Sequence, residues 1–577
     1  MVCLFEYNQR TVICLCRINR SGRNAVDGNR RLYAIQHKPL RTGDDQGIDR
    51  TSSVVMQCEL RGSQKVTLGI LTMLLFSAAL GLMLGANMAK SLDHDEHQFV
   101  TSGALLARET KLPYVDYAYF HMPNMVFVYA VLFSVTDHLL LSARLFSTVC
   151  AWLTLGLIFC LALCLFRHYH YLLRFLIAAS TTVFLLTNPV FAYTSGKAWN
   201  HDLAILMALG AFVMHSEGAS REHRQRWLGV SGLLLGLAIG TRLTFAPLVL
   251  PFLVMIAFYP RRAGWRGTLS LMLSFLLGTL VGLLPSAILF ALAPKQFLFG
   301  NFGYARYNTL YRQVEGFVEG DVSSIAMSFS GKLCYLARYI LSTPSMVLLI
   351  LAFVFFVLSM NIARFRRVFP HRFPIIFSLI SLPFLLLGSF SPTPAFFQYF
   401  YAPIPFLLVG TLYGVASFQD QNNRMNWSTT LLVHVLLLAG AFGLKLYQDA
   451  GSLSAPDEWL SSRVHQAGLE IKATAGDRPV LSLAPLLPLE GRASILAEFA
   501  TGPFGWRIAP FVPEKTRQEI GLIAEADLVG FLQAHPHAAI LVGHEGTLEQ
   551  PFIEYAEDYG YQPVELSDGS VLWLAPQ

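Results

Sequence analysis

The stretch VTLGILTMLLFSAALGLMLGANM, residues 66–88, decides the fold class of this chain. It contains no charged side chain, and it is longer than the ~20 apolar residues that a helix needs to cross ~30 Å of hydrocarbon. The sequence therefore predicts a transmembrane helix here. The polar residues that follow at once, from Lys90 onward, begin a loop at the membrane surface.

The composition of the whole chain is also typical of a membrane protein. Of its 577 residues, 54% are hydrophobic and 14% are charged, and the mean hydropathy is +0.47. A soluble protein carries about 25% charged residues, and a soluble chain of this length divides into several polar-surfaced domains. These values exclude an ordinary soluble enzyme, a disordered protein and a fibrous repeat protein. A polytopic α-helical membrane protein remains.

Ten further apolar runs are predicted to cross the membrane, which makes eleven spans within a membrane domain over residues 66–448. They cover residues 141–166, 171–192, 202–216, 227–242, 243–259, 268–293, 336–360, 374–390, 401–418 and 428–447. The run NMVFVYAVLFSVT, residues 124–136, is too short to cross, so we interpret it as a re-entrant or interfacial helix. The longest predicted outer loops are 89–140 and 294–335.

Basic residues predict the orientation of these spans. With a cytoplasmic N-terminus, 13 Lys and Arg residues and three acidic residues fall on the inner loops 167–174, 217–226, 260–266, 361–372 and 419–426. The outer loop 89–140 has three basic and six acidic residues. Because cytoplasmic loops are enriched in Lys and Arg, we expect the N-terminus inside and the C-terminus outside.

The two ends of the chain differ in charge and patterning. Residues 1–65 carry 11 basic and six acidic side chains, and we expect a basic cytosolic extension without a fold of its own, with translation starting at Met56 as a hypothesis. Residues 449–577 carry seven basic and 18 acidic side chains and alternate helix and strand patterns, with a hairpin turning at Asp568-Gly569. They predict a small, separately folding α/β domain on the outer face. The chain has no basic patch interleaved with aromatic residues, so no nucleic-acid partner is expected.

The loop after the first span concentrates groups that can carry out chemistry: SLDHDEHQFVTSGALLARETKLPYVDYAYFHMPN, residues 91–124. Asp93, Asp95 and Glu96 fall at the membrane surface, near the level of a lipid headgroup. A carboxylate there can act as a general base toward a hydroxyl within about 3 Å. Carboxylates also bind divalent metal ions, with His94 and His97 as further ligands. A solvated acidic loop end is the third interpretation that these residues leave open.

The order of motifs resembles the first outer loop of the GT-C glycosyltransferases, membrane enzymes related to dolichyl-phosphate-mannose protein mannosyltransferases and lipid A aminoarabinose transferases. The matching elements are Asp95-Glu96, Phe99, Gly103, Leu106-Ala107, Pro113-Tyr114-Val115-Asp116, His121-Met122-Pro123 and, at the opening of the next span, Ala143-Arg144-Leu145-Phe146-Ser147. The resemblance covers roughly residues 66–420. It implies a GT-C-like fold and inverting transfer of a hexosyl or pentosyl group from a polyprenyl-phosphate sugar to a lipid, glycan or protein acceptor. The expected location is the inner membrane of a bacterium, with a periplasmic C-terminal domain.

The resemblance also implies roles for single residues. Asp95 matches the catalytic base of the family, with Glu96 beside it and Asp93 as a neighbouring carboxylate. Asp202 matches a second acidic position in the next outer loop. The alternative for Asp202 is an acid that is favoured by the helix dipole at a helix N-terminus.

Basic and aromatic residues at the outer ends of spans complete the predicted site. Arg242, in GLAIGTRLTF, is the best candidate to bind the donor phosphate, because a lone Arg between two apolar runs is unfavourable unless it meets an anion. A snorkelling interfacial Arg is the alternative. Lys197 is the second candidate, and Arg306 and Arg312 are weaker ones. Further candidates for substrate binding are Asp93, Asp116, His121, Tyr399 and Tyr401, although the two tyrosines also suit an aromatic belt.

Two functions from other classes stay open. A secondary transporter would have polar groups near the membrane midplane and repeated halves, and the sequence has no evident internal repeat. A non-catalytic membrane scaffold would bind a partner through its outer domain. An outer cavity that brings together Asp95, Asp202 and Arg242 would favour the enzyme.

Overall fold

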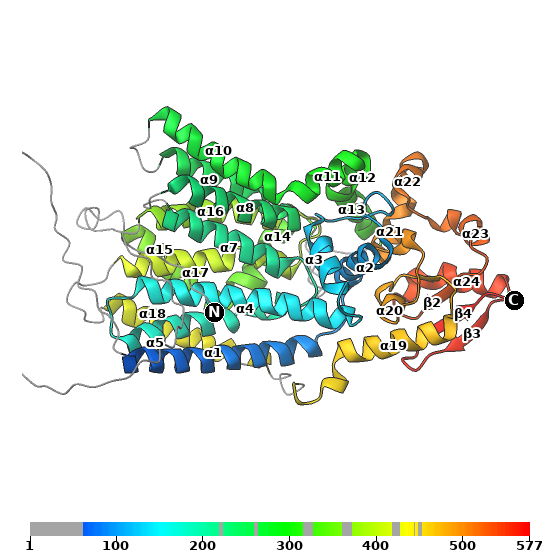
Figure 1. Ribbon diagram of the computed structural model, residues 1–577, viewed down its shortest axis with the longest axis horizontal. Coiled ribbons are helices and arrows are strands. Elements are labelled where there is room, and N and C mark those ends of the chain that lie inside the picture. Colours follow the sequence, from blue (N-terminus) through cyan, green and yellow to red (C-terminus); the bar gives the residue numbers. More distant parts are fainter. Residues whose placement is uncertain are drawn as a thin grey trace, which may run out of the picture. The chain divides into compact units, whose positions relative to one another are not determined.

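The computed structural model describes residues 62–218, 223–258, 264–315, 327–359, 372–417, 427–443, 445–447 and 453–576 (Figure 1). Nearly all of the predicted N-terminal extension, including Met56, lies outside these residues. So do parts of three predicted inner loops, the whole predicted loop 419–426 and the predicted domain boundary at residue 449. The orientation of the chain in the membrane therefore stays a prediction.

Each of the eleven apolar runs coincides with helix. The helices in these runs are α1 (Gly62–Ala89), α4 (Leu139–Leu165), α5 (Tyr171–Leu186), α7 (His201–Gly218), α8 (Arg224–Thr241), α9 (Val249–Phe258), α10 (Trp265–Gly282), α11 (Leu284–Leu292), α15 (Pro344–Ser359), α16 (Arg372–Phe390), α17 (Pro403–Ala416) and α18 (Trp427–Gly443). Short helices α6 (Pro189–Thr194) and α14 (Phe329–Tyr335) lie between them.

Among the described residues, five helices are long and apolar enough to cross a membrane unaided: α1, α4, α10, Phe373–Phe390 and Phe397–Ala416. A sixth span results if Phe329–Leu341 and Pro344–Phe355, which meet at 98°, are counted as one. The chain is an integral membrane protein with a helical fold, whereas the count of eleven crossings stays a prediction. The predicted boundary between the spans 227–242 and 243–259 is a break between α8 and α9, where Arg242 is extended and residues Leu243–Leu248 form a 3-10 helix with Pro247 inside it.

The contact between α8 and α10 depends on glycine. A Cβ at Gly236 would lie 2.2 Å from the carbonyl oxygen of Thr279, and one at Gly278 would lie 2.1 Å from that of Gly229. Small residues let helix backbones approach closely in membranes, where packing rather than the hydrophobic effect drives association. These glycines therefore fix the distance between the two helices and hold the end of α8, where Arg242 lies.

Several short helices lie at the same end of the bundle as the C-terminal segment, residues 453–576 (Figure 1). They are α2 (His94–Glu109), α3 (Asn124–Phe133), α12 (Pro294–Leu298) and α13 (Tyr304–Val314). Helix α3 is ten residues long and packs on α2. It agrees with the prediction of a short helix that does not span the membrane.

The C-terminal segment contains a four-stranded sheet with the strand order β1-β2-β4-β3. Strands β1 (Val480–Ser482) and β2 (Ala539–Val542) are parallel, while β4 (Val571–Leu574) is antiparallel to both β2 and β3 (Gln562–Glu565). The predicted strands and the hairpin at Asp568-Gly569 are confirmed. The helices around the sheet are α19 (Leu460–Ala475), α20 (Leu486–Glu490), α21 (Pro503–Ile508), α22 (Glu514–Ile520), α23 (Glu525–Gln533) and α24 (Gln550–Asp558).

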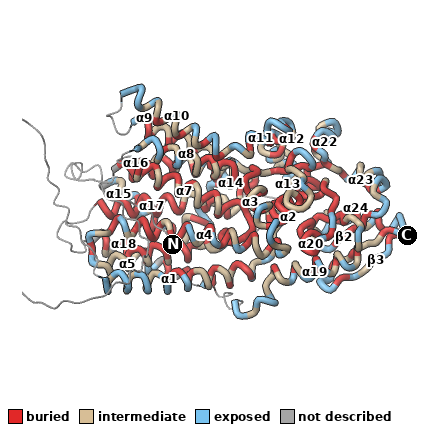
Figure 2. The backbone as a smooth tube through the Cα atoms, viewed as in Figure 1, coloured by how far each residue is buried: buried red, intermediate tan, exposed pale blue. Residues whose placement is uncertain are grey.

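The C-terminal segment and the outer loops share one apolar core. A single cluster of buried residues joins Phe99 and Tyr129, from α2 and α3, to Ile471, Val480 and Leu541 of the C-terminal segment. Figure 2 shows the same continuity, with buried backbone in α2, α3, α20 and β2. Part of the core of the segment therefore comes from residues 99–140, and its folding as a separate domain stays a prediction.

Candidate functional site

Helix α2 carries the acidic residues of the first outer loop and fixes their directions. Asp93 Oδ1 accepts a hydrogen bond from the Asp95 backbone N–H (3.1 Å), and Glu96 Oε2 accepts one from the Asp93 N–H (3.2 Å). This reciprocal pattern is a capping box, which starts a helix. Successive residues on a helix point about 100° apart, so Asp95 and Glu96 face different surroundings.

Glu96 faces inward and forms a buried ion pair with Arg144, and both side chains are 0% exposed. Arg144 Nε donates to Glu96 Oε1 (2.8 Å) and Nη2 to Oε2 (2.6 Å), while the Ala198 N–H also donates to Oε1 (2.8 Å). Arg144 Nη1 donates to the carbonyls of Asn87 and Lys90, which ties the end of α1 to α2. Both oxygens of Glu96 are engaged, so this residue holds the loop in place rather than facing a substrate.

Asp95 is half-buried, and none of the described residues donates a hydrogen bond to its carboxylate. Burial, followed by the negative charge of Asp93, raises the pKa of Asp95 to about 6. The positive charges of Arg242, His94 and Arg507 oppose this rise. At neutral pH the carboxylate is therefore ionised and has free lone pairs to accept a proton.

Arg242 faces Asp95 from the end of α8. Its Nη1 donates to Asn200 Oδ1 (2.8 Å) and its Nε to Thr244 Oγ1 (3.1 Å). The guanidinium carbon lies 5.0 Å from the centroid of the Tyr399 ring, within the range of a cation–π contact. The side chain is thus held between the end of α8 and the 3-10 helix that precedes α9, the junction at which the sequence predicts it.

Arg507 reaches the same place from the C-terminal segment. It is 7% exposed, its Nη2 donates to the Tyr304 hydroxyl (2.6 Å), and its Nε has no partner among the described residues. Burial and the nearby charge of Arg507 lower the pKa of Arg312. Positive charge is therefore concentrated beside Asp95.

Lys197 is held at the edge of this group. Its Nζ lies 3.3 Å from Asp93 Oδ2, 4.3 Å from the centroid of the Trp199 ring and 5.0 Å from that of Tyr193. Asp93 thus has two roles, as the cap of α2 and as the partner of Lys197. The structure brings both predicted residues to the side of Asp95.

His121 and Tyr399 also lie in this group. The His121 ring stacks on Phe99 with centroids 5.0 Å apart, and burial together with the charge of Arg242 lowers its pKa to about 3, so it is neutral. The Tyr399 ring stacks on His201 with centroids 6.3 Å apart. Both residues supply rigid walls around Arg242.

Asp202 does not join the site. It is 1% exposed, its Oδ2 accepts a hydrogen bond from the Gly196 N–H (2.8 Å), and its nearest cationic partner is Lys90. Gly196 has a φ of +77°, a conformation that favours glycine. Asp202 therefore stabilises the turn before α7, and the structure does not bring it together with Asp95 and Arg242.

Three other candidates also lie away from the site. Asp116 is exposed and closes a turn by accepting a hydrogen bond from the Leu112 N–H (2.6 Å). Arg306 is exposed, and its guanidinium carbon lies 5.9 Å from the Tyr307 ring centroid. Tyr401 is 0% exposed in the helix bundle.

The predicted metal ligands do not converge. His94 Nδ1 lies 2.9 Å from Glu545 Oε1, and the hydrogen bond to Glu545 raises the pKa of His94. His97 is buried, and burial lowers its pKa to about 3. The set His94, Asp95 and His97 is not among the described side chains that lie close enough to share an ion.

Arg507 and Glu545 are residues of the site that the sequence interpretation did not find. Both belong to the C-terminal segment, for which the sequence gives no candidate site residue. Arg507 is the single charged residue in PFGWRIAPF, residues 503–511. A lone Arg among apolar residues is the signal that identified Arg242, and the same signal could have identified Arg507.

Two cavities lie at the junction of residues 133–138 with the C-terminal segment, with volumes of 820 and 460 Å³. Neither is lined by Asp95, Asp202 or Arg242. The cavity that would favour an enzyme over a transporter or scaffold is thus not one of these two. Arg242 is near enough to Asp95 for its positive charge to oppose the rise in the pKa of Asp95.

Known proteins resemble this chain in sequence and fold. The family model described as dolichyl-phosphate-mannose-protein mannosyltransferase matches residues 121–290. No curated protein matches the chain in sequence. The crystal structure of ArnT from Cupriavidus metallidurans bound to undecaprenyl phosphate has a TM-score of 0.55 at 14% identity, covering 88% of this chain and 99% of that chain. ArnT in the apo state has a TM-score of 0.55 at 12% identity, covering 89% and 99%.

Proposed function

We propose, from the fold that this chain shares with GT-C type membrane glycosyltransferases, that it transfers a sugar from a polyprenyl-phosphate donor to an acceptor on the outer face of the membrane. The family match supports the resemblance inferred from the sequence. The observation that carries the proposal is an ionised, half-buried Asp95 that faces two arginines from separate parts of the chain.

Asp95 is the general base in this proposal. A base must be unprotonated and must have free lone pairs within hydrogen-bond reach of the proton that it removes. None of the described residues donates a hydrogen bond to its carboxylate, and its pKa of about 6 lies near the range in which a base is efficient. It deprotonates the acceptor hydroxyl or amine as the acceptor attacks the anomeric carbon, and a direct attack of this kind inverts that carbon.

Arg242 and Arg507 stabilise the phosphate that leaves. Bond breaking returns negative charge to the phosphate oxygens, and fixed guanidinium groups stabilise such charge as it develops. Arg507 suits this role because it is buried with its Nε unbonded among the described residues. Arg312 and Lys197 add positive charge at the edge.

The donor class follows from the fold and the location of the site. The crystal structure of ArnT with this fold was obtained with undecaprenyl phosphate bound. Asp95 and Arg242 lie where the ends of α1 and α8 meet the outer loops. A lipid phosphate can reach that level while its tail stays among the apolar helices.

The test compares Asp95→Asn with Asp116→Asn, a matched control from the same loop. Each variant is expressed in cells that lack the chromosomal gene, and lipid-linked and total glycans are compared by mass spectrometry. We expect the wild type and Asp116→Asn to restore the missing sugar, and Asp95→Asn to insert normally but to lose about 10²–10⁴-fold in transfer. Restoration by Asp95→Asn at wild-type level would contradict the proposed base.

A further inference from the structure

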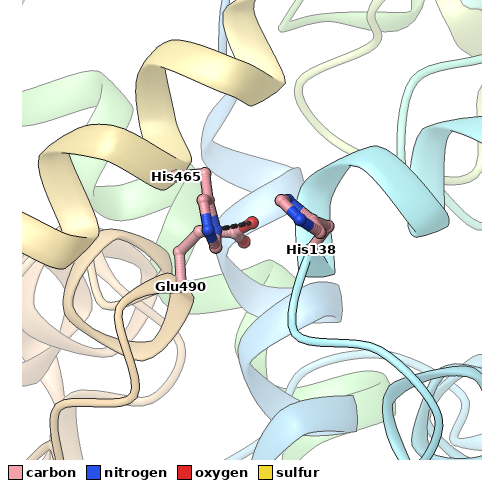
Figure 3. A group of neighbouring side chains, drawn as sticks. All are labelled: His138, His465 and Glu490. Carbon is pink, nitrogen blue, oxygen red and sulfur yellow. Dashed lines mark hydrogen bonds and ion pairs between the residues drawn. The ribbon is translucent and has the colours of Figure 1, made fainter.

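A second polar cluster lies where the C-terminal segment meets the membrane part of the chain. His138 immediately precedes α4, His465 lies in α19, and Glu490 is the last residue of α20 (Figure 3). The three residues come from two regions more than 300 positions apart in the sequence. Their meeting point is therefore a product of the tertiary fold.

The three side chains converge on one point. The rings of His138 and His465 have centroids 4.0 Å apart, and His465 Nδ1 lies 3.3 Å from Glu490 Oε1 (Figure 3). One ligand atom from each residue lies within 4.8 Å of the other two. Nitrogen and oxygen ligands of zinc lie about 2.0–2.2 Å from the ion, so small side-chain rotations bring all three to one ion.

The charges at the cluster favour a cation. The Glu490 side chain is 0% exposed, and its Oε2 accepts a hydrogen bond from the Leu140 N–H (3.1 Å). None of the described cationic side chains hydrogen-bonds to it, because the neighbouring Arg108 donates instead to Asp137 (3.2 Å). A buried carboxylate without a compensating charge is unfavourable. A cation between this carboxylate and two imidazoles would remove the penalty.

An ion can reach the cluster from solvent. His138, His465 and Glu490 all line the cavity of 460 Å³, together with Asp137 and Arg492. His138 is itself exposed. The cavity is large enough for a hydrated ion to enter and for water to complete its coordination.

We propose that His138, His465 and Glu490 bind a divalent transition-metal ion, with Zn²⁺ as the best match. Two imidazoles and one carboxylate suit Zn²⁺, which takes four tetrahedral ligands and accepts water as the fourth. Two imidazoles do not suit Mg²⁺ or Ca²⁺, which prefer oxygen ligands. The alternative is that Glu490 only caps the N-terminus of α4, which leaves the position of His138 without explanation.

The metal has a structural role in this proposal. Asp95 lies at the first turn of α2, and Arg108, beside the cluster, lies at the last, which separates them by about 20 Å at 1.5 Å per residue. The ion is therefore too far away to take part in the chemistry at Asp95. By joining α4 to α19 and α20, it fastens the C-terminal segment, which carries Arg507, onto the outer loops.

The test uses the full-length protein in detergent, stripped with a chelator and then titrated with Zn²⁺ alone. We expect about one tightly bound zinc per chain by mass spectrometry of the metal, and a higher melting temperature with zinc than without. His138→Ala should weaken zinc binding at least about tenfold. Loss of a residue that only hydrogen-bonds to a metal ligand already weakens metal binding about 10–100-fold. Because His138 is exposed, we expect His138→Ala to fold like the wild type. His465→Gln is the second variant.

Two controls make the result decisive. His535→Ala removes a histidine that follows α23 in the same segment and should leave zinc affinity and the thermal shift unchanged. His94→Ala tests the ion pair with Glu545 and should also leave them unchanged. Wild-type affinity in both His138→Ala and His465→Gln, or loss of zinc only in His94→Ala, would overturn the site. The first outcome does not bear on Asp95, so the proposed function would stand, whereas the second would place the ion at His94, beside Asp95.

Discussion

The two ends of helix α2 carry polar groups whose charges are satisfied in different ways. At the first turn, Asp95 receives no hydrogen bond from the described residues and is faced by Arg242 and Arg507. At the last turn, Arg108 and Asp137 are bonded to each other and to the C-terminal segment. A charged group without a hydrogen-bond partner indicates a site that can bind a ligand. Charged groups that are paired with each other indicate a structural contact, here between α2 and the C-terminal segment. One helix thus serves both purposes.

The same contrast separates two adjacent carboxylates. Asp95 faces the arginines, while Glu96 is fully bonded to Arg144. Their chemistry is nearly identical, and the direction imposed by the helix decides their roles. Variants at the two ends of α2 test whether these roles differ.

The largest effect on stability is expected from Glu96→Gln. Removing one partner of a buried pair leaves Arg144 buried without a counter-charge, which costs about 3–5 kcal/mol in the free energy of unfolding. Thermal unfolding in detergent measures the loss. Glu109→Gln, at the exposed end of the same helix, should change stability by less than about 1 kcal/mol. Equal stability of the two variants would show that Glu96 is not structural.

Arg507→Met should weaken binding of undecaprenyl phosphate about 10- to 100-fold. Hydrogen bonds to charged groups contribute about 1.5–3 kcal/mol, and methionine keeps the apolar packing of the side chain. Equilibrium binding to the purified protein measures the effect. Arg306→Met, an exposed arginine on α13, is the control and should bind like the wild type. Unchanged binding in Arg507→Met would remove the C-terminal segment from the site.

Transfer should fall about tenfold per pH unit below pH 6. Asp95 acts in its ionised form, and burial together with Asp93 raises its pKa to about 6 against the opposing charges of Arg242, His94 and Arg507. Protonation below this pKa removes the base. In Arg507→Met one opposing charge is lost, so the acid limb should move to higher pH. A rate that stays constant down to about pH 5 would contradict this assignment.

The smallest effect is expected from Asp137→Asn, in the loop before α4, where Asp137 pairs with Arg108 at the last turn of α2. Its partners Arg108 and Arg492 lie at the surface, where ion pairs contribute about 0–1 kcal/mol. Transfer should stay at the wild-type rate, and the melting temperature should change little. A loss of transfer as large as that expected for Asp95→Asn would show that the two ends of α2 do not differ in function.

The sequence predicts the parts that depend on local pattern. The apolar runs coincide with helices, α3 is short as expected, and the C-terminal hairpin turns at Asp568-Gly569. The sequence also predicts the junction at Arg242, because a charged residue is unfavourable inside an apolar span and therefore marks the end of one. Each of these features can be recognised from about twenty consecutive residues of the sequence.

The parts that depend on side-chain direction and distant contacts are missed. Asp202 occupies the predicted helix start, but the turn at Gly196 directs it inward. Arg507 reaches the site because α21 packs against α13, a contact between residues about 200 positions apart. No local pattern encodes such a contact, so the sequence alone does not identify Arg507 as a site residue.

The central claim is that the base and the phosphate site lie together at the first turn of α2. The most direct test measures undecaprenyl phosphate binding and sugar transfer in the same purified preparation of Asp95→Asn. We expect this variant to bind the lipid phosphate at least as tightly as the wild type, because a negative charge beside the arginines is gone, while transfer falls about 10²–10⁴-fold. Transfer at the wild-type rate, or loss of lipid binding in a folded protein, would contradict it.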